Sequence, residues 1–244
     1  MEVKNIVSED GVAMLIAMMA LLLMTALGIA VILTSSSETI IAAHFRNSLE
    51  ARYAADAMIE RAMDDVVSVA DWNTLIDGST QSALVDGAPT GLRTLGDGST
   101  IDLAQVVNLA NCQKTTACSL ADMNAITAER PWGANNPRWK PYAYGPLRDM
   151  LPATNTIDSP DYVLLLVGDD PSETDNDPTT DGAGVTNPGR DVIAMRSEAF
   201  GPHGAHTVIE VSAGKTVDIF GDENDYNNGI GQAVVRILSW REVR

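Results

Sequence analysis

An uncharged apolar segment near the amino terminus constrains this chain more than any other feature of its sequence. The segment runs from Val12 to Leu33 without a single charged side chain, and only Thr25 and Gly28 interrupt its large apolar residues. A helix of this length extends about 33 Å, and the hydrocarbon core of a bilayer is about 30 Å thick. A core helix of a soluble domain usually keeps a polar side, and a cleaved signal peptide has a shorter apolar region. The segment therefore predicts a membrane-spanning helix.

Length and charge limit what else the chain contains. With 244 residues and a formal net charge of -17, it has room for one anchor helix and one domain of ordinary size. Binding to nucleic acid needs a basic surface that displaces counterions from phosphates, so the composition argues against a nucleic-acid partner. It argues equally against docking on anionic lipid headgroups. We also find no nucleophile motif, no phosphate loop and no paired catalytic carboxylates, so we predict no enzymatic activity.

The apolar segment continues as an amphipathic helix. Apolar residues recur at three- and four-residue steps after Leu33, and oppositely charged residues such as Arg46 and Glu50 lie four positions apart on the polar side. No proline occurs between residues 12 and 70. The pattern predicts one nearly continuous helix from Val12 to the region 72–78, where Gly78 supplies a stop signal.

This long stretch resembles the type IV pilin-like class, and within it the PilX amino-terminal family of pilus assembly proteins. In that family a short leader ends in glycine, and an apolar run, a serine-rich patch with an acid and an alanine-rich helix follow. Here the corresponding letters are "SEDG" before the apolar run, "SSSE" at residues 35–38 and "ARYAADAMIERA" at residues 51–62. The resemblance covers about the first quarter of the chain.

The resemblance implies that a prepilin peptidase cuts between Gly11 and Val12 and that the new amino group of Val12 is methylated. Position five of the mature chain is then Ile16, where major pilins usually carry a glutamate. The missing acid points to a minor or tip-located subunit. The leader also departs from expectation, because Lys4 is its only basic side chain and cytoplasmic flanks are usually richer in Lys and Arg.

The remaining sequence predicts an α+β head. Short apolar runs separated by Gly, Pro, Asn and Asp indicate a strand at residues 162–170, a hairpin turning at Gly201 to Gly204, and a last strand at the carboxyl end. We expect an antiparallel sheet of at least four strands packed on the outer half of the long helix, as in pilin-like heads. The predicted divisions are a leader at 1–11, a helix at 12–78 whose part 12–33 lies in the membrane, and a head at 79–244.

The two cysteines, Cys112 and Cys118, are close enough in sequence to close a small loop as a disulfide in an oxidising compartment. A free-thiol state is the alternative. Zinc would need more ligands than this pair, and the three histidines are distant in sequence. An exported head favours the disulfide.

Six acids gather between residues 169 and 181 without a basic residue among them. Their mutual repulsion would be relieved by a hard cation such as Ca²⁺, with Asp175, Asp177 and Asp181 as the candidate ligands. The alternative is a solvated loop, which is the commoner fate of acidic segments that contain proline. A second acidic segment at residues 218–229 poses the same choice with fewer acids.

Together these features predict a minor pilin or pilus-assembly subunit that primes or caps a type IV pilus-like filament. Its partners would be other pilin subunits, a prepilin peptidase and the inner membrane, with the head in the periplasm and later on a filament or the cell surface. Two alternatives stay open. One is the tip pseudopilin of a type II secretion system, and the other is a membrane-anchored surface module for binding or adhesion.

Overall fold

The computed structural model describes residues 10–126, 132–150, 158–173, 175–182, 189–218 and 232–243. The chain forms two compact units, which are divided between Arg46 and Asn47 inside the first helix. The first unit contains the apolar part of that helix. The second contains the rest of the helix and the whole head.

The long helix α1 spans Asp10–Val66, which is 57 residues. From Val12 to Leu33 its large apolar side chains are all more than half exposed. This part of α1 is long and apolar enough to cross a membrane. The long amino-terminal helix that the hydropathy pattern predicts is therefore present.

The end of α1 lies earlier than the sequence predicts. The helix stops at Val66, and a separate short helix, α2, spans Asn73–Ile76. The indole Nε1 of Trp72 donates a hydrogen bond to the carbonyl of Val66 over 3.2 Å, and both Trp72 and Val66 are buried. The side chain of Trp72 thus folds back onto the carbonyl of the last residue of α1, and the chain turns before Gly78.

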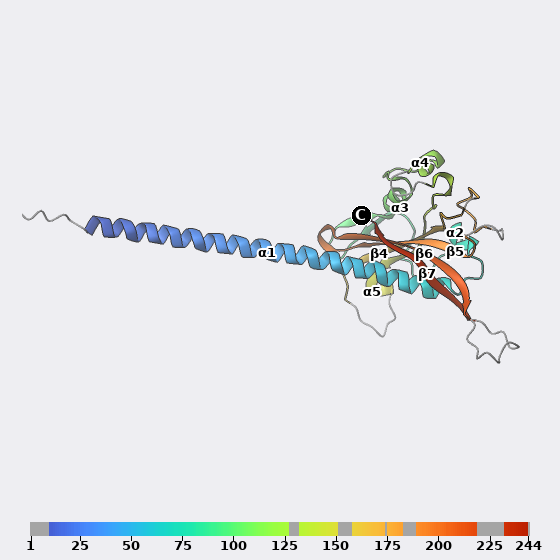
Figure 1. Ribbon diagram of the computed structural model, residues 1–244, viewed down its shortest axis with the longest axis horizontal. Helices are drawn as coiled ribbons and strands as arrows, with labels where there is room; N and C mark the ends of the chain where they lie inside the picture. Colours follow the sequence, from blue (N-terminus) through green and yellow to red (C-terminus); the bar gives the residue numbers. More distant parts are fainter. Residues whose placement is uncertain are drawn as a thin grey trace, which may run out of the picture. The chain divides into compact units, whose positions relative to one another are not determined.

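The head is built on a five-stranded antiparallel sheet in the order β3-β4-β5-β6-β7 (Figure 1). The strands follow one another along the chain as an antiparallel meander. Their bounds are Lys140–Pro146 for β3, Tyr162–Asp169 for β4, Val192–Phe200 for β5, His206–Asp218 for β6 and Gln232–Val243 for β7. The α+β class and the predicted hairpin are confirmed, and the hairpin turn contains the 3₁₀ helix η2, Pro202–Gly204.

Strand β3 is not among the strands that the sequence predicted. Its two prolines, Pro141 and Pro146, argue against a strand in the sequence, since proline is found in strands only at edges or bulges. Strand β3 satisfies both conditions, because it is the first strand of the sheet and its register shifts between Pro141 and Ala143. Residues 82–86 cover its outer side, with the amide of Tyr144 donating to the carbonyl of Leu84 over 3.1 Å.

Both faces of the sheet are covered by apolar clusters. On one face the outer part of α1 packs through small residues such as Ala51 and Ala55 against Val163, Leu165 and Val167. The opposite face carries Tyr162, Leu164 and Leu166 of the same strand and packs on the helix α3, Leu103–Cys112. Because β4 is buried on both faces, its sequence is an unbroken apolar run and does not alternate.

Smaller elements complete the head on the α3 side. Figure 1 shows α3 and α4 together on one side of the strands. The bounds are Leu92–Thr94 for β1, Thr100–Asp102 for β2, Leu120–Asn124 for α4, Gly133–Asn135 for η1 and Leu147–Met150 for α5.

Candidate functional site

The predicted processing site lies at the start of α1. Gly11 and Val12 are both helical, and a side chain added at Gly11 would meet nothing within 4 Å. Val12 and Ile16 are each 61% exposed. Residues 1–9 of the predicted leader lie outside the described residues.

Four hydroxyl groups between Thr25 and Thr39 donate hydrogen bonds to carbonyls of α1 itself. The hydroxyl of Thr25 donates to the carbonyl of Leu22 over 2.9 Å, and that of Thr34 donates to Ala30 over 2.9 Å. Ser37 and Thr39 do the same with carbonyls four residues earlier. A polar group that is paired internally costs little to remove from water, so these side chains are compatible with an apolar environment.

The predicted disulfide is present. Cys112 and Cys118 are bonded, with their Cα atoms 5.9 Å apart. Cys112 is the last residue of α3, and Gln113 after it adopts a left-handed conformation with φ of 56°. The bridge closes the turn that leads from α3 towards α4.

The three candidate calcium ligands are not brought together. Asp177 accepts hydrogen bonds from the amide of Thr179 and the hydroxyl of Thr180, and Asp181 accepts from the amide of Asp191 over 2.9 Å. Within the described residues, no group of three or more His, Cys, Asp or Glu side chains is placed to hold a metal ion. Asp177 is thus bonded within its own turn and Asp181 to a segment further along the chain, which the acid spacing alone does not reveal. Most of the second acidic segment, residues 219–229, lies outside the described residues.

The acidic segment also differs from a solvated loop, because its first part is buried. Asp169 is 2% exposed and Glu173 is 1% exposed. Burial and the neighbouring charge of Glu173 raise the pKa of Asp169 to about 8. Burial likewise raises the pKa of Asp181 to about 6. The carboxyl of Asp169 is therefore largely protonated at neutral pH.

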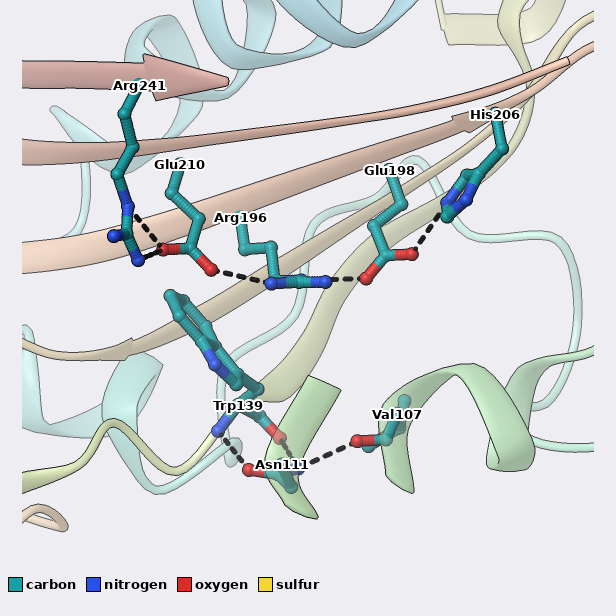
Figure 2. A network of polar contacts seen from close by, with 8 residues as sticks. All are labelled: Val107, Asn111, Trp139, Arg196, Glu198, His206, Glu210 and Arg241. Carbon is teal, nitrogen blue, oxygen red and sulfur yellow. Dashed lines mark hydrogen bonds and ion pairs between the residues drawn. The ribbon is translucent and has the colours of Figure 1, made fainter. Parts of the chain in front are cut away.

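A chain of charged side chains crosses strands β5, β6 and β7 on the face away from α1 (Figure 2). Arg196 lies at its centre and donates from Nε to Glu198 over 2.7 Å and from Nη1 to Glu210 over 2.6 Å. The guanidinium of Arg241 donates to the other oxygen of Glu210 over 3.0 Å. His206 meets the other oxygen of Glu198 at 3.0 Å.

This charged network is a feature that the sequence analysis missed. Arg196 and Glu198 are two residues apart in β5 and so share a face of the sheet, and Glu210 is the cross-strand partner of Arg196. Burial alone would raise the pKa of Glu198, but His206 and Arg196 outweigh it and lower that pKa. The alternation of charges in "MRSEAF" at residues 195–200 was the available signal. Its meaning depends on register, which the sequence does not specify.

His206 is the outer member of this network. Its ring stacks on Phe200 with centroids 4.5 Å apart, and its side chain is 44% exposed. The backbone amide of His203 donates to Asp97 over 2.9 Å. Neither histidine belongs to a group that is arranged to bind metal in the described part of the chain.

A cavity of about 200 Å³ lies next to the charged network. Glu210 and Arg241 of the network form part of its floor, and Trp132 and Trp139 form part of its wall. It contains no pair of groups set up for nucleophilic or acid-base chemistry, since both carboxylate oxygens of Glu210 already accept from arginines. Comparison with protein-family models, with curated proteins and with solved structures finds no match to this chain.

Proposed function

We propose that this chain is a minor subunit of a type IV pilus-like filament, where it primes or caps assembly through its apolar helix. The observation that carries the proposal is the change of character along α1. One uninterrupted helix, Asp10–Val66, is apolar all round in its first half and forms part of the core of the head in its second. An anchor alone needs only about 20 residues, so a longer rod requires another explanation.

Such a helix suits transfer from lipid into a bundle of sister helices. Its exposed apolar side chains find comparable surroundings in a bilayer and between neighbouring helices. Four hydroxyls, those of Thr25, Thr34, Ser37 and Thr39, donate hydrogen bonds to carbonyls of the helix itself. They therefore need no new partners after transfer. Assembly then depends on packing along α1, and the head determines which subunit is the neighbour.

The proposed setting is the inner membrane before assembly, with the head in the periplasm and afterwards on a filament or the cell surface. The disulfide between Cys112 and Cys118 supports a head outside the cytoplasm, where disulfides persist. Ile16 in place of an acid supports a minor position. The proposed partners are other pilin subunits and a prepilin peptidase, with no nucleic acid.

The amino terminus of the protein purified from the cells that produce it tests this proposal. Mass spectrometry is expected to find a chain that begins with methylated Val12. Gly11→Leu is expected to block that processing, and Gly28→Leu is the matched control, because Gly28 is also a helical glycine with nothing within 4 Å of an added side chain. A mature protein that retains Met1 would contradict the proposal.

Deletion of the gene separates the two related functions. Loss of pili supports the pilus subunit, whereas loss of protein secretion with pili intact supports the tip pseudopilin of a type II secretion system. The third function, an anchored surface-binding module, is favoured by the cavity in the head. Removing the head would then abolish adhesion and leave assembly intact.

A further inference from the structure

The cavity beside the charged network has two chemically different sides. Its floor is formed on β6 and β7, with Glu210, Ser212, Ser239 and Arg241 as its polar residues. The cross-strand pairs Glu210 with Arg241 and Ser212 with Ser239 place these residues on the sheet face away from α1. The floor therefore offers hydroxyl, carboxylate and guanidinium groups from two adjacent strands.

A second group of lining residues, which we call the wall, is apolar. It is formed by Trp132, Pro137, Trp139 and Pro171, which come from the segment before β3 and from the turn after β4. Trp132 is 39% exposed although its indole is large and apolar. Aromatic and proline surfaces pack well against the C–H groups of a ring and supply area without rotational freedom to lose.

One donor in this wall has no partner. Trp139 is 2% exposed, and its indole Nε1 makes no hydrogen bond to any described residue. A buried indole N–H normally has an acceptor, and leaving it unpaired costs about 1 to 3 kcal/mol. Because this nitrogen is itself buried, it is not exposed to the cavity, and Trp139 takes part in the wall through the rest of its side chain.

The floor carries no uncompensated charge. Glu210 accepts from both Arg196 and Arg241, and Arg196 also pairs with Glu198, so two cations balance two anions. Figure 2 shows the indole of Trp139 beside the Arg196 and Glu210 pair. A charged ligand would find no unbalanced opposite charge here. A neutral ligand that both donates and accepts hydrogen bonds matches the groups present.

We propose that this cavity binds a neutral saccharide through a single sugar ring. A sugar ring combines an apolar C–H face for the indoles and prolines with hydroxyl groups for the serines and the ion pair. The space of about 200 Å³ is below the range of about 300 to 1,000 Å³ that is typical of drug-sized ligands. This space suits one ring. This activity is independent of filament assembly.

The test is a binding measurement on the full-length protein in a detergent without a sugar headgroup. Neutral hexoses and N-acetylhexosamines are titrated by calorimetry and by saturation-transfer NMR. At least one of them is expected to bind, with a dissociation constant on the order of 1 mM, as is reasonable for so small a ligand. Glucuronic acid and free amino acids are titrated alongside, and tighter binding of either class would overturn the proposal.

Variants then locate the site. Trp132→Ala is expected to weaken sugar binding at least tenfold, whereas Trp240→Ala, which removes an indole that is 42% exposed but does not line this cavity, leaves it unchanged. Trp139→Phe replaces the bicyclic indole with a smaller aromatic ring and so reduces the wall, and it is expected to weaken binding several-fold with an unchanged circular dichroism spectrum. Equal sugar binding by Trp132→Ala and by the unaltered protein would refute the site. So would the absence of binding at sugar concentrations about 50 to 100 times the expected dissociation constant.

Discussion

Asn111 of α3 and Trp139 exchange hydrogen bonds in both directions (Figure 2). The amide of Trp139 donates to Oδ1 of Asn111 over 2.8 Å, and Nδ2 of Asn111 donates to the carbonyl of Trp139 over 3.0 Å. Both residues are buried. One side-chain amide therefore satisfies the two backbone groups of a residue that begins the approach to β3, and it ties α3 to the wall of the cavity.

Replacing Asn111 with Ala is expected to destabilise the head by about 2 kcal/mol, because two buried backbone groups of Trp139 lose their partners. Urea unfolding followed by circular dichroism measures the change. Gln105→Ala is the control, since Gln105 lies on the same helix and is exposed. A variant of Asn111 as stable as the control would show that water replaces the lost bonds.

Removing the disulfide is expected to cost about 2 kcal/mol, as estimated from the loop-closure entropy of a short ring. The ring joins residues six positions apart in sequence. The double variant Cys112→Ser with Cys118→Ser should unfold at lower denaturant concentration than the oxidised protein. Adding reductant should lower the midpoint of the unaltered protein and leave that of the double variant where it is. A shift in the double variant would point to a different effect of the reductant.

Arg196→Met is expected to destabilise the head by about 3 to 5 kcal/mol. The substitution removes the cation that the buried carboxylates of Glu198 and Glu210 share, and leaves Glu198 with His206 and Glu210 with Arg241 at the more exposed ends of the network; breaking a buried ion pair by removing one partner is costly. Arg148→Met is the matched control, because the Arg148 side chain is 60% exposed and its ion pair with Asp149 spans 3.9 Å. Equal unfolding midpoints for the two variants would mean that solvent reaches the network.

Asp169→Asn is expected to stabilise the protein increasingly as the pH rises. The folded-state pKa of Asp169 is raised from its ordinary value of 3.8 to about 8 by burial and by Glu173. Between those values the folded protein binds a proton that the unfolded chain has lost, so the stability of the unaltered protein falls with rising pH in this window. The difference between variant and unaltered protein should be small at pH 4, grow to pH 8 and then level off.

Asp97→Asn provides a control of opposite sign for this pH series. Hydrogen bonds from Ser99 and the amide of His203 lower the pKa of Asp97 to about 2. A carboxyl whose pKa is lower in the folded protein stabilises the fold at pH values above its ordinary pKa. That stabilisation is lost as the pH falls through the folded-state pKa. This variant should therefore be less stable than the unaltered protein at neutral pH, and the deficit should shrink below pH 4. Parallel curves for Asp169→Asn and Asp97→Asn would contradict both assignments.

The sequence indicated the elements whose cause is local. Three elements could be predicted because each depends on neighbours along the chain. They are α1 from its uncharged apolar run, the turn containing η2 from its bounding glycines, and strand β4 from its aliphatic block. The end of α1 was placed too late, because it depends on Trp72 folding back on Val66. Strand β3 was missed because its prolines are tolerated only at an edge of the sheet, and the sequence does not mark an edge.

What the sequence determined by itself is therefore a membrane-compatible helix that continues into an α+β head with one short disulfide loop. Only the tertiary structure decided which polar residues meet. Register places Arg196 between Glu198 and Glu210, and the packing of the segment before β3 sets two indoles above the floor formed by β6 and β7. Asp177 and Asp181 are close in sequence, but they accept hydrogen bonds from different segments of the chain. Local pattern specifies secondary structure, whereas contacts between distant segments depend on strand pairing and chain direction, which a linear pattern does not contain.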